Sequence, residues 1–344
     1  MPRRVSMKWS LLIACILAAL CPALLMQAQD AAPPAATPPA ATPTPAATPA
    51  PAPAAPALPA PPAPNLADPA GRRILIISVD GLRPDLMLRG DTPRMRSLLD
   101  QASFTCWAQT TQVSITLPSH VSMLTGVEPK KHAITWNDDR ELPPDTWPQY
   151  PTIFELAKQA GYSTAMIAGK LKFKVLLKPG TLDWSYVPTT GKATDTAVGD
   201  EAVRVLREHQ PQVMFVHFAE PDGAGHKYGW SSPEQMKTIA GADVQIGRLL
   251  DTLSDLKLRD ATWIIVTADH GGAGKGHGAN DPRSLHIPWI ITGPGIKAGQ
   301  DLTIHKELVV HTEDTFATAC WLLTIPQPAD IQGRPVVQVA ATTP

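Results

Sequence analysis

Six residues of this chain have the types and spacing to hold metal ions. One aspartate is followed by a histidine four residues later, and another is followed by a histidine at the next position. Carboxylate oxygens and imidazole nitrogens in this combination suit zinc or manganese better than calcium. The set is large enough for two ions, which at about 4 Å would clamp the attacking and leaving oxygens of a displacement at phosphorus. The six residues are Asp80, Asp222, His226, Asp269, His270 and His277.

A hydroxyl group occupies a position suited to a nucleophile. Thr116 precedes Leu117, Pro118 and a short apolar stretch. Because proline is favoured in the first turn of a helix, we predict a helix that begins at or just after Thr116. Amide donors and the helix dipole favour phosphate oxygens at such an end, and a bound metal would activate the hydroxyl without a general base. A simple capping role for Thr116 is the alternative.

The elements that must position these residues alternate between strands and helices. Apolar, β-branched runs indicate strands at Ile74–Val79, Tyr162–Ile167, Val213–Phe218, Trp263–Ala268 and Trp289–Thr292. Runs that are apolar on both faces favour parallel strands in a buried sheet. Helical patterns lie between them, at 93–101, 152–161, 194–209, 232–256 and 312–323. The alternation predicts an α/β fold, and the aspartates then follow the carboxyl ends of strands, where such sheets bind ligands.

Several short strings, in this order, resemble the alkaline phosphatase superfamily, close to its type I phosphodiesterase/nucleotide pyrophosphatase branch. The resemblance runs from Ile74 to about Val337 and implies a three-layer α/β/α sandwich around a mostly parallel sheet. Two strings depart from the usual pattern, at Leu117–His120 and at Ala133, but neither touches a ligand position. The strings are VDGLRPD (79–85), TLPSHVSMLTG (116–126), WN (136–137), EPDGAGH (220–226), TADHG (267–271) and HG (277–278) before IPWIITGPG (287–295).

The resemblance implies a role for each residue of the site. Thr116 would form a covalent phospho-enzyme, and Asn137 would donate its amide to a phosphoryl oxygen. His286 is an alternative to His277 as the last ligand, but a glycine follows His277 and the GPG strand end comes at the expected distance. We expect the remaining histidines to be structural. One Zn²⁺ (or another divalent ion such as Mn²⁺) would be held by Asp80, Thr116, Asp269 and His270, and the other by Asp222, His226 and His277.

The substrate class depends on two lysines. Lys170 and Lys172 resemble the Lys-x-Arg pair of Asn/Lys/Arg-type alkaline phosphatases, and a cation there would favour the extra charged oxygen of a monoester. A solvated basic stretch is the alternative. We therefore lean to a phosphomonoesterase, with a phosphodiesterase/nucleotide pyrophosphatase as the alternative and an inactive metal-binding module as the non-enzyme possibility. A sulfatase is disfavoured because that class needs a Cys or Ser that is converted to formylglycine, and Thr116 cannot be converted. A mutase is disfavoured because mutase substrates are cytosolic, whereas we expect this chain to be exported.

The amino-terminal residues differ from the rest in composition. Basic residues precede an apolar run, Leu11–Met26, that is short for a membrane span of about 20 residues. We expect 1–30 to be a signal peptide of a periplasmic or secreted protein; an uncleaved anchor or lipid attachment at Cys15 is the alternative, and only these would bring it to a membrane. The Pro/Ala/Thr-rich segment 31–70 is expected to be a disordered, polyproline-type linker, which leaves 71–344 as a single domain.

Charge and cysteine content exclude several classes of protein. Lys and Arg total 30 and Asp and Glu total 31, so charge does not favour binding to a nucleic-acid polymer, and we expect a small phosphate ester as partner. The chain has 4 cysteines and no CxxC pair, which argues against a disulfide-dense scaffold or a zinc ribbon. Cys106 and Cys320, which would remain after export, could pair or stay free thiols.

Overall fold

The structure is a computed structural model that describes residues 71–278 and 280–341. The expected signal peptide at 1–30 and linker at 31–70 lie outside the described residues. Among the helices that are described, none combines the length and apolarity needed to cross a membrane. Cys106 is half-buried and Cys320 is buried, and both are free thiols.

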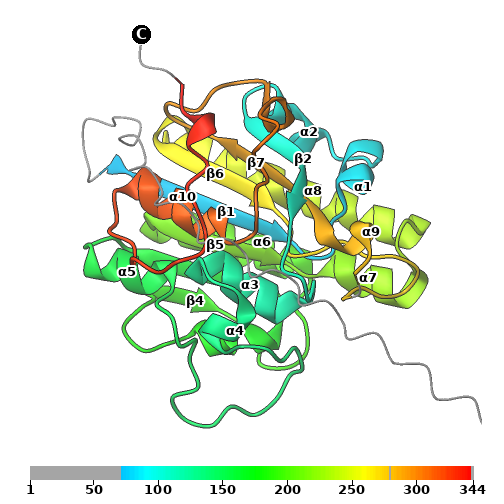
Figure 1. Ribbon diagram of the computed structural model, residues 1–344, viewed down its shortest axis with the longest axis horizontal. Helices are drawn as coiled ribbons and strands as arrows, with labels where there is room; N and C mark the ends of the chain where they lie inside the picture. The colour runs from blue at the N-terminus through cyan, green and yellow to red at the C-terminus, as the bar shows by residue number, and fades with distance from the viewer. Residues whose placement is uncertain (1–70, 279, 342–344) are drawn as a thin grey trace, which may run out of the picture. The chain divides into compact units, whose positions relative to one another are not determined.

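A mixed sheet forms the centre of the described domain, with the strand order β4-β3-β5-β1-β6-β7-β2-β8 (Figure 1). All neighbouring pairs are parallel except those that β7 makes with β6 and β2. The expected α/β fold with a mostly parallel sheet is therefore confirmed. The strands are β1 (Arg73–Val79), β2 (Ser103–Gln109), β3 (Thr164–Ala168), β4 (Trp184–Tyr186), β5 (Val213–Phe218), β6 (Thr262–Thr267), β7 (His286–Thr292) and β8 (Gln300–Asp301).

The direction of β7 corrects the sequence-based expectation. Residues 289–292 were expected to form a parallel strand, but Ile291 of β7 pairs antiparallel with Ile265 of β6. A strand inside the sheet is buried on both faces whether it runs parallel or antiparallel to its neighbours, so the apolar run does not reveal the direction of β7. Among the described residues between the two strands, the four-residue α9 (Pro282–Leu285) is the only helix, and no crossover helix is present. β7 therefore starts at the edge of the sheet where β6 ends.

Helices cover both faces of the sheet, which explains why β5 and β6 are buried along their whole length. One group packs around α8, which contacts α1, α2, α6 and α7, and the other packs around α10, which contacts α3 and α5 (Figure 1). The helices are α1 (Pro84–Arg89), α2 (Pro93–Leu99), α3 (Thr116–Thr125), α4 (Pro129–His132), α5 (Ile153–Gln159), α6 (Asp195–His209), α7 (Glu220–Tyr228), α8 (Pro233–Asp255), α9 and α10 (Asp314–Leu323), with 3₁₀ turns η2 (Leu171–Leu176), η3 (Arg259–Ala261), η4 (Leu302–Ile304) and η5 (Val337–Val339).

Helix α3 is fixed tightly at both ends. It begins at Thr116, as expected, and all of its residues are buried. It ends at Gly126, whose φ of 72° is in the left-handed region. A Cβ at this position would lie 2.5 Å from Cδ1 of Phe316, so only glycine fits both the turn and the contact with α10. The packing fixes the direction in which the start of α3 points.

Candidate metal centre and active site

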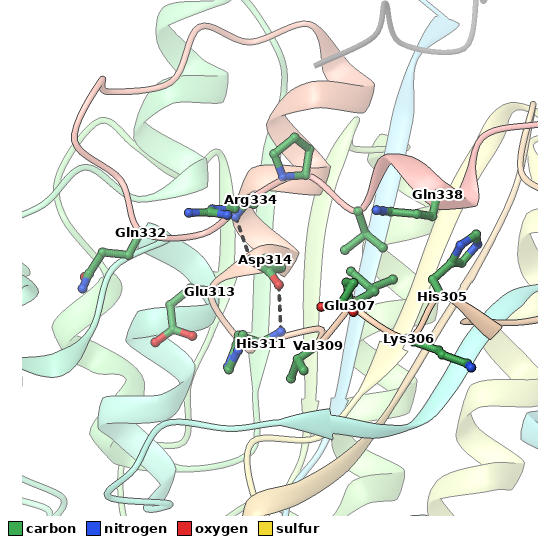
Figure 2. A pocket seen from close by; sticks show the side chains of 13 residues that line it. His305, Lys306, Glu307, Val309, His311, Glu313, Asp314, Gln332, Arg334 and Gln338 are labelled. Atoms are coloured by element: carbon green, nitrogen blue, oxygen red, sulfur yellow. Dashed lines mark hydrogen bonds between the residues drawn. The ribbon is translucent and has the colours of Figure 1, made fainter. Parts of the chain in front are cut away.

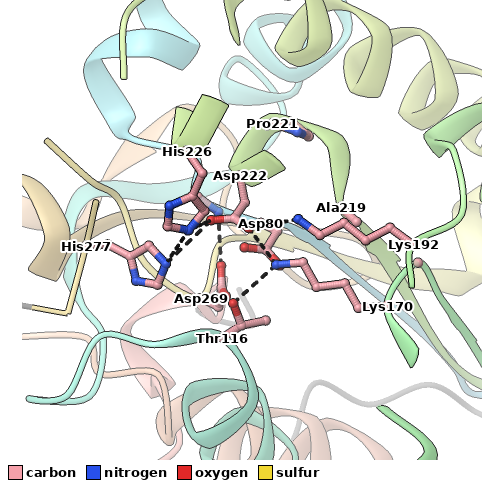
Figure 3. Close-up of polar contacts among 12 residues, drawn as sticks. Asp80, Thr116, Lys170, Lys192, Ala219, Pro221, Asp222, His226, Asp269 and His277 are labelled. Atoms are coloured by element: carbon pink, nitrogen blue, oxygen red, sulfur yellow. Dashed lines mark hydrogen bonds and ion pairs between the residues drawn. The ribbon is translucent and has the colours of Figure 1, made fainter. Parts of the chain in front are cut away.

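The carboxyl ends of three adjacent strands bring the predicted aspartates together. Asp80 follows β1 directly, Asp269 comes just after β6, and Asp222 lies in the first turn of α7, which follows β5. All three side chains are buried. Figure 3 shows them close to one another. Because β5, β1 and β6 are neighbours in the sheet, their ends place the three carboxylates side by side, as the sequence predicted.

The histidines divide these aspartates into two clusters. Asp80, Asp269 and His270 form one, and Asp222, His226 and His277 form the other, with potential ligand atoms within 4.8 Å of one another in each. The membership is the one that the resemblance implied. His286, the alternative to His277, instead stacks on Trp107 with ring centroids 4.0 Å apart.

Hydrogen bonds to backbone carbonyls fix the histidine tautomers. Nδ1 of His226 donates to the Lys275 carbonyl (3.0 Å), and Nδ1 of His277 donates to the Ser114 carbonyl (2.8 Å). A carbonyl only accepts, so in the neutral ring Nδ1 carries the hydrogen and Nε2 presents a lone pair. The two Nε2 atoms lie 3.0 Å apart and face each other, which leaves a place for a shared cation. Asp222 raises the pKa of His226, so a proton competes for the same place.

Each of the three aspartates in these clusters has one carboxylate oxygen without a hydrogen-bond partner among the described residues. These oxygens are Asp80 Oδ1, Asp222 Oδ1 and Asp269 Oδ2. Asp269 Oδ2 lies 3.2 Å from Nε2 of His270, whose Nδ1 donates to the Gly271 carbonyl. Burial lowers the pKa of His270 to about 3, so its Nε2 is also an acceptor. Buried acceptors that face one another without a donor are unfavourable unless a cation lies between them. The donor set therefore fits divalent ions that prefer nitrogen and oxygen ligands.

Lys170 connects the two clusters. Its Nζ lies 2.6 Å from Asp80 Oδ2 and 2.7 Å from Asp222 Oδ2, and the residue is 2% exposed. Burial alone would lower the pKa of the ammonium, but Asp222 and Asp80 raise it above its ordinary value. Burial and the neighbouring Asp80 carboxylate raise the pKa of Asp269 well above its usual range. One buried ammonium thus faces three carboxylates, and the alternative of a solvated basic stretch is wrong for Lys170.

Thr116 lies between these groups. Its Oγ1 is 3.3 Å from His270 Nε2 and 3.3 Å from Lys170 Nζ (Figure 3). It is the first residue of α3, after an N-cap at Ile115, and no side-chain cap bond is formed at this end. The hydroxyl is therefore directed at the clusters instead of capping the helix.

Asn137 and Lys172 lie next to Thr116. The Leu117 amide donates to Oδ1 of Asn137 (2.9 Å), and Lys172 Nζ donates to the same oxygen (3.3 Å) and to the Asn137 carbonyl. Because Oδ1 accepts these bonds, the NH₂ group is the end of the amide left to donate. The structure thus brings together all the expected site residues, with Lys172 in contact with Asn137 and not with a carboxylate.

Two histidines that we expected to be structural support the site directly. His217 Nδ1 accepts from the Gly169 amide, so its Nε2 carries the hydrogen and donates to Asp80 Oδ2 (2.9 Å). His120 Nδ1 donates to the Thr116 carbonyl (2.8 Å). A histidine inside the apolar run of β5, and another one helical turn after Thr116, were the signals in the sequence that pointed to this role.

A buried carboxyl couples the starts of α6 and α7. Asp195 Oδ1 accepts from the Ala219 amide (2.7 Å) and the Glu220 amide (3.1 Å), and the Asp195 amide donates to Glu220 Oε2 (2.8 Å). Asp195 Oδ2 is buried without a hydrogen-bond partner in the described chain. Burial is the main reason why the pKa of Asp195 is raised to about 7.

This carboxyl predicts a pH-dependent stability. The pKa rises from 3.8 to about 7, so the contribution of Asp195 is fully present below 3.8 and is lost as the pH rises through 7. Asp195→Asn keeps the Oδ1 acceptor but cannot ionise. We expect the variant to gain up to about 4 kcal/mol over the native protein between about pH 4 and pH 7, seen as diverging Tm curves. Parallel curves would show that Asp195 does not titrate in this range.

A separate hollow of about 740 Å³ lies between the segments 305–314 and 332–338, and neither metal-ligand cluster contributes to its lining (Figure 2). Asp314 lies at its wall, and its carboxylate accepts from the His311 amide (2.7 Å) and the Arg334 amide (2.7 Å). These bonds hold the two segments together, so the role of Asp314 here is structural.

Comparisons with known proteins identify related chains. A family model described as type I phosphodiesterase/nucleotide pyrophosphatase matches residues 74–276. An uncharacterised pyrophosphatase/phosphodiesterase of Schizosaccharomyces pombe is 27% identical over 58% of this chain and 44% of its own length. A bis(5'-adenosyl)-triphosphatase of Mus musculus is 25% identical over 61% of this chain and 49% of its own length. The chain thus spans about half the length of the curated relatives it matches.

A solved structure shows the same fold. It is a threonine-to-alanine variant of murine ectonucleotide pyrophosphatase/phosphodiesterase 5, described as inactive and in complex with AMP. It matches with a TM-score of 0.64 and 15% identity, over 78% of this chain and 100% of that one. These comparisons favour the phosphodiesterase/pyrophosphatase alternative over the phosphomonoesterase to which the sequence analysis leaned.

Proposed function

Because the chain belongs to the type I phosphodiesterase/nucleotide pyrophosphatase family, we propose that it hydrolyses phosphodiester or pyrophosphate bonds in small nucleotide-like substrates. The observation that carries this proposal is the placement of Thr116 Oγ1, 3.3 Å from His270 of the first metal-ligand cluster and 3.3 Å from Lys170, which contacts both clusters. Relatives whose names include bis(5'-adenosyl)-triphosphatase, and one bound to AMP, support the substrate class.

Two zinc ions, or other divalent ions such as Mn²⁺, would be held by the two clusters, with Thr116 added to the first. Such ions would supply Lewis-acid polarisation of the phosphoryl oxygens. The Thr116 oxygen attacks phosphorus and its proton passes to the solvent, the bond to the leaving group breaks, and a covalent phospho-threonine forms that keeps the other ester group of the substrate. Water then attacks phosphorus, which releases a phosphate monoester such as a nucleotide and restores the hydroxyl.

The residues around Thr116 orient the substrate. The free NH₂ group of Asn137 donates to a non-bridging phosphoryl oxygen, since Oδ1 is already held by the Leu117 amide. His120 and His217 hold the Thr116 carbonyl and the Asp80 carboxylate in place. These bonds preorganise the site before the substrate arrives.

A phosphomonoesterase is the second candidate function. The observation that favours it is the buried Lys170 ammonium, 3.3 Å from Thr116 Oγ1, where it could meet the extra charged oxygen of a monoester. Comparing kcat/KM for p-nitrophenyl phosphate, bis-p-nitrophenyl phosphate and diadenosine triphosphate tests these two candidate functions. If the protein is a phosphodiesterase/pyrophosphatase, kcat/KM is higher for bis-p-nitrophenyl phosphate and diadenosine triphosphate than for the monoester p-nitrophenyl phosphate. Higher kcat/KM for the monoester would favour the second candidate, and no turnover by the metal-loaded protein would favour an inactive module.

The two lysines give this comparison a sharper form. If they serve the monoester, the double variant Lys170→Ala, Lys172→Ala should lose about 10²–10³-fold in monoester kcat/KM and much less for diesters. Lys174→Ala, a half-buried residue of the same 3₁₀ turn, is the matched control. Metal content is measured in each variant. An unchanged monoester/diester ratio would remove the lysines from substrate selection.

Export is also part of the proposal. It rests on the basic and apolar pattern of residues 1–30. Sequencing the amino terminus of the full chain after expression in a bacterium with a periplasm tests it: a new terminus near residue 30 supports export, and an intact Met1 in the cell interior contradicts it.

A further inference from the structure

A second lysine reaches the metal-ligand clusters from the outside. Lys192 Nζ lies 3.7 Å from Asp222 Oδ2, the same oxygen that Lys170 contacts at 2.7 Å (Figure 3). The two lysines differ in burial, because the side chain of Lys170 is 3% exposed and that of Lys192 is 47% exposed. Asp222 therefore separates a buried ammonium from one that remains open to solvent at the rim.

The backbone holds Lys192 firmly in this position. The Leu171 amide donates to the Gly191 carbonyl (3.0 Å), and the Ala193 amide donates to the Gly169 carbonyl (2.9 Å). These bonds flank an antiparallel bridge between Lys192 and Lys170. Three residues later, Asp195 joins the segment to the start of α7, the helix that carries Asp222. Lys192 is thus anchored to the structures that position both Lys170 and Asp222.

Pairing with Asp222 does not account for this arrangement. Lys170 already satisfies Asp222 Oδ2, and 3.7 Å is longer than a hydrogen bond. An ion pair with one half-exposed partner contributes little to stability. The ammonium of Lys192 therefore keeps donors for another anion at the rim of the site.

We propose that Lys192 binds a second phosphate group of the substrate, next to the phosphorus that is attacked, and so selects pyrophosphate-linked substrates over diesters with a single phosphate. This inference rests on the proposed function. A pyrophosphate or triphosphate bridge carries anionic oxygens on the neighbouring phosphorus, which an ammonium recognises by charge-assisted hydrogen bonds. Negative charge grows on that group as the bridging bond breaks, so the contact strengthens in the transition state.

The test compares two substrates in the zinc-loaded full chain. Lys192→Ala should lower kcat/KM for diadenosine triphosphate about 10- to 100-fold, the range for a hydrogen bond to a charged group, and change that for bis-p-nitrophenyl phosphate less than about twofold. Lys192→Arg should restore most of the loss because it keeps a cation at the rim. The control is Lys227→Ala, since Lys227 is an exposed lysine of α7 whose ammonium lies over the Tyr228 ring.

Other outcomes would overturn the inference. If Lys192→Ala slows both substrates by the same factor, or loses bound zinc, then Lys192 only balances the charge of Asp222. If the native protein and Lys192→Ala have equal kcat/KM for diadenosine triphosphate, a contact between Lys192 and a substrate phosphate is also excluded. If the native protein hydrolyses neither substrate, the proposed function itself fails, which is a different result from a uniform loss in an active enzyme.

Discussion

Replacing Thr116 by alanine is expected to lower kcat by about 10⁴-fold or more for every substrate the protein hydrolyses. The Oγ1 atom lies 3.3 Å from both His270 Nε2 and Lys170 Nζ, so the change removes the atom that would attack phosphorus. Alanine is a good helix former, and the Thr116 hydroxyl makes no cap bond in α3. The fold should therefore survive with a similar Tm.

The serine variant is the matched control for this experiment. Thr116→Ser keeps the hydroxyl and should retain far more activity than Thr116→Ala. Mass spectrometry after a rapid quench with substrate should detect a peptide containing residue 116 that carries the phosphoryl group of the substrate with its remaining ester group, in the native protein and not in the alanine variant. Turnover by Thr116→Ala at the native rate, with native metal content, would exclude Thr116 as the nucleophile.

The second large effect concerns bound metal. We expect the purified protein to hold about two divalent ions of the zinc class, and a strong chelator should abolish activity until the ions are restored. The reason is the set of buried carboxylate oxygens and imidazole lone pairs that face one another without a donor between them. Elemental analysis before and after dialysis against the chelator measures this. Full activity in the chelator, with no ion bound, would contradict the assignment.

Single substitutions separate the two clusters. Asp269→Ala and His226→Ala should each lose about one ion and most of the activity, because each removes a ligand from a different cluster. His305→Ala is the control, since His305 lies in a separate part of the structure and bonds to Gln300. If both variants keep two ions, the clusters are not the binding sites.

Residue types and strand ends were enough to predict most of the candidate site. Asp80 and Asp269 follow continuous apolar runs, and parallel strands in one sheet must bring such ends to a common edge. The five predicted helices lie within two residues of α2, α5, α6, α8 and α10. The long helices α6 and α8 have one buried face and begin after the N-caps Thr194 and Ser232, which are readable in the sequence.

Other features depend on contacts between distant segments. The helix α7 was not predicted, since Gly223 and Gly225 weaken the helical pattern and packing against α8 compensates for them. The bridge that Lys170 makes between two carboxylates could not be read from the sequence, because a lysine with lysines nearby is equally typical of a solvated surface. Only the folded arrangement distinguishes these possibilities.

The return of the chain from β6 to β7 has an evolutionary consequence. Both ends of this connection lie at the ligand-binding edge, where amides of Gly271 and Gly272 bond to the carbonyls of Ser284 and Arg283. These bonds close the base of a loop that contains His277 and an exposed turn at 274–275. Residues inserted at that turn would lengthen the loop without shifting a strand, provided that the Lys275 carbonyl, which accepts from Nδ1 of His226, keeps its place. Descendants of such a chain can therefore acquire a new cover over the site, and with it a new substrate range, as long as this bond to the ligand set is inherited.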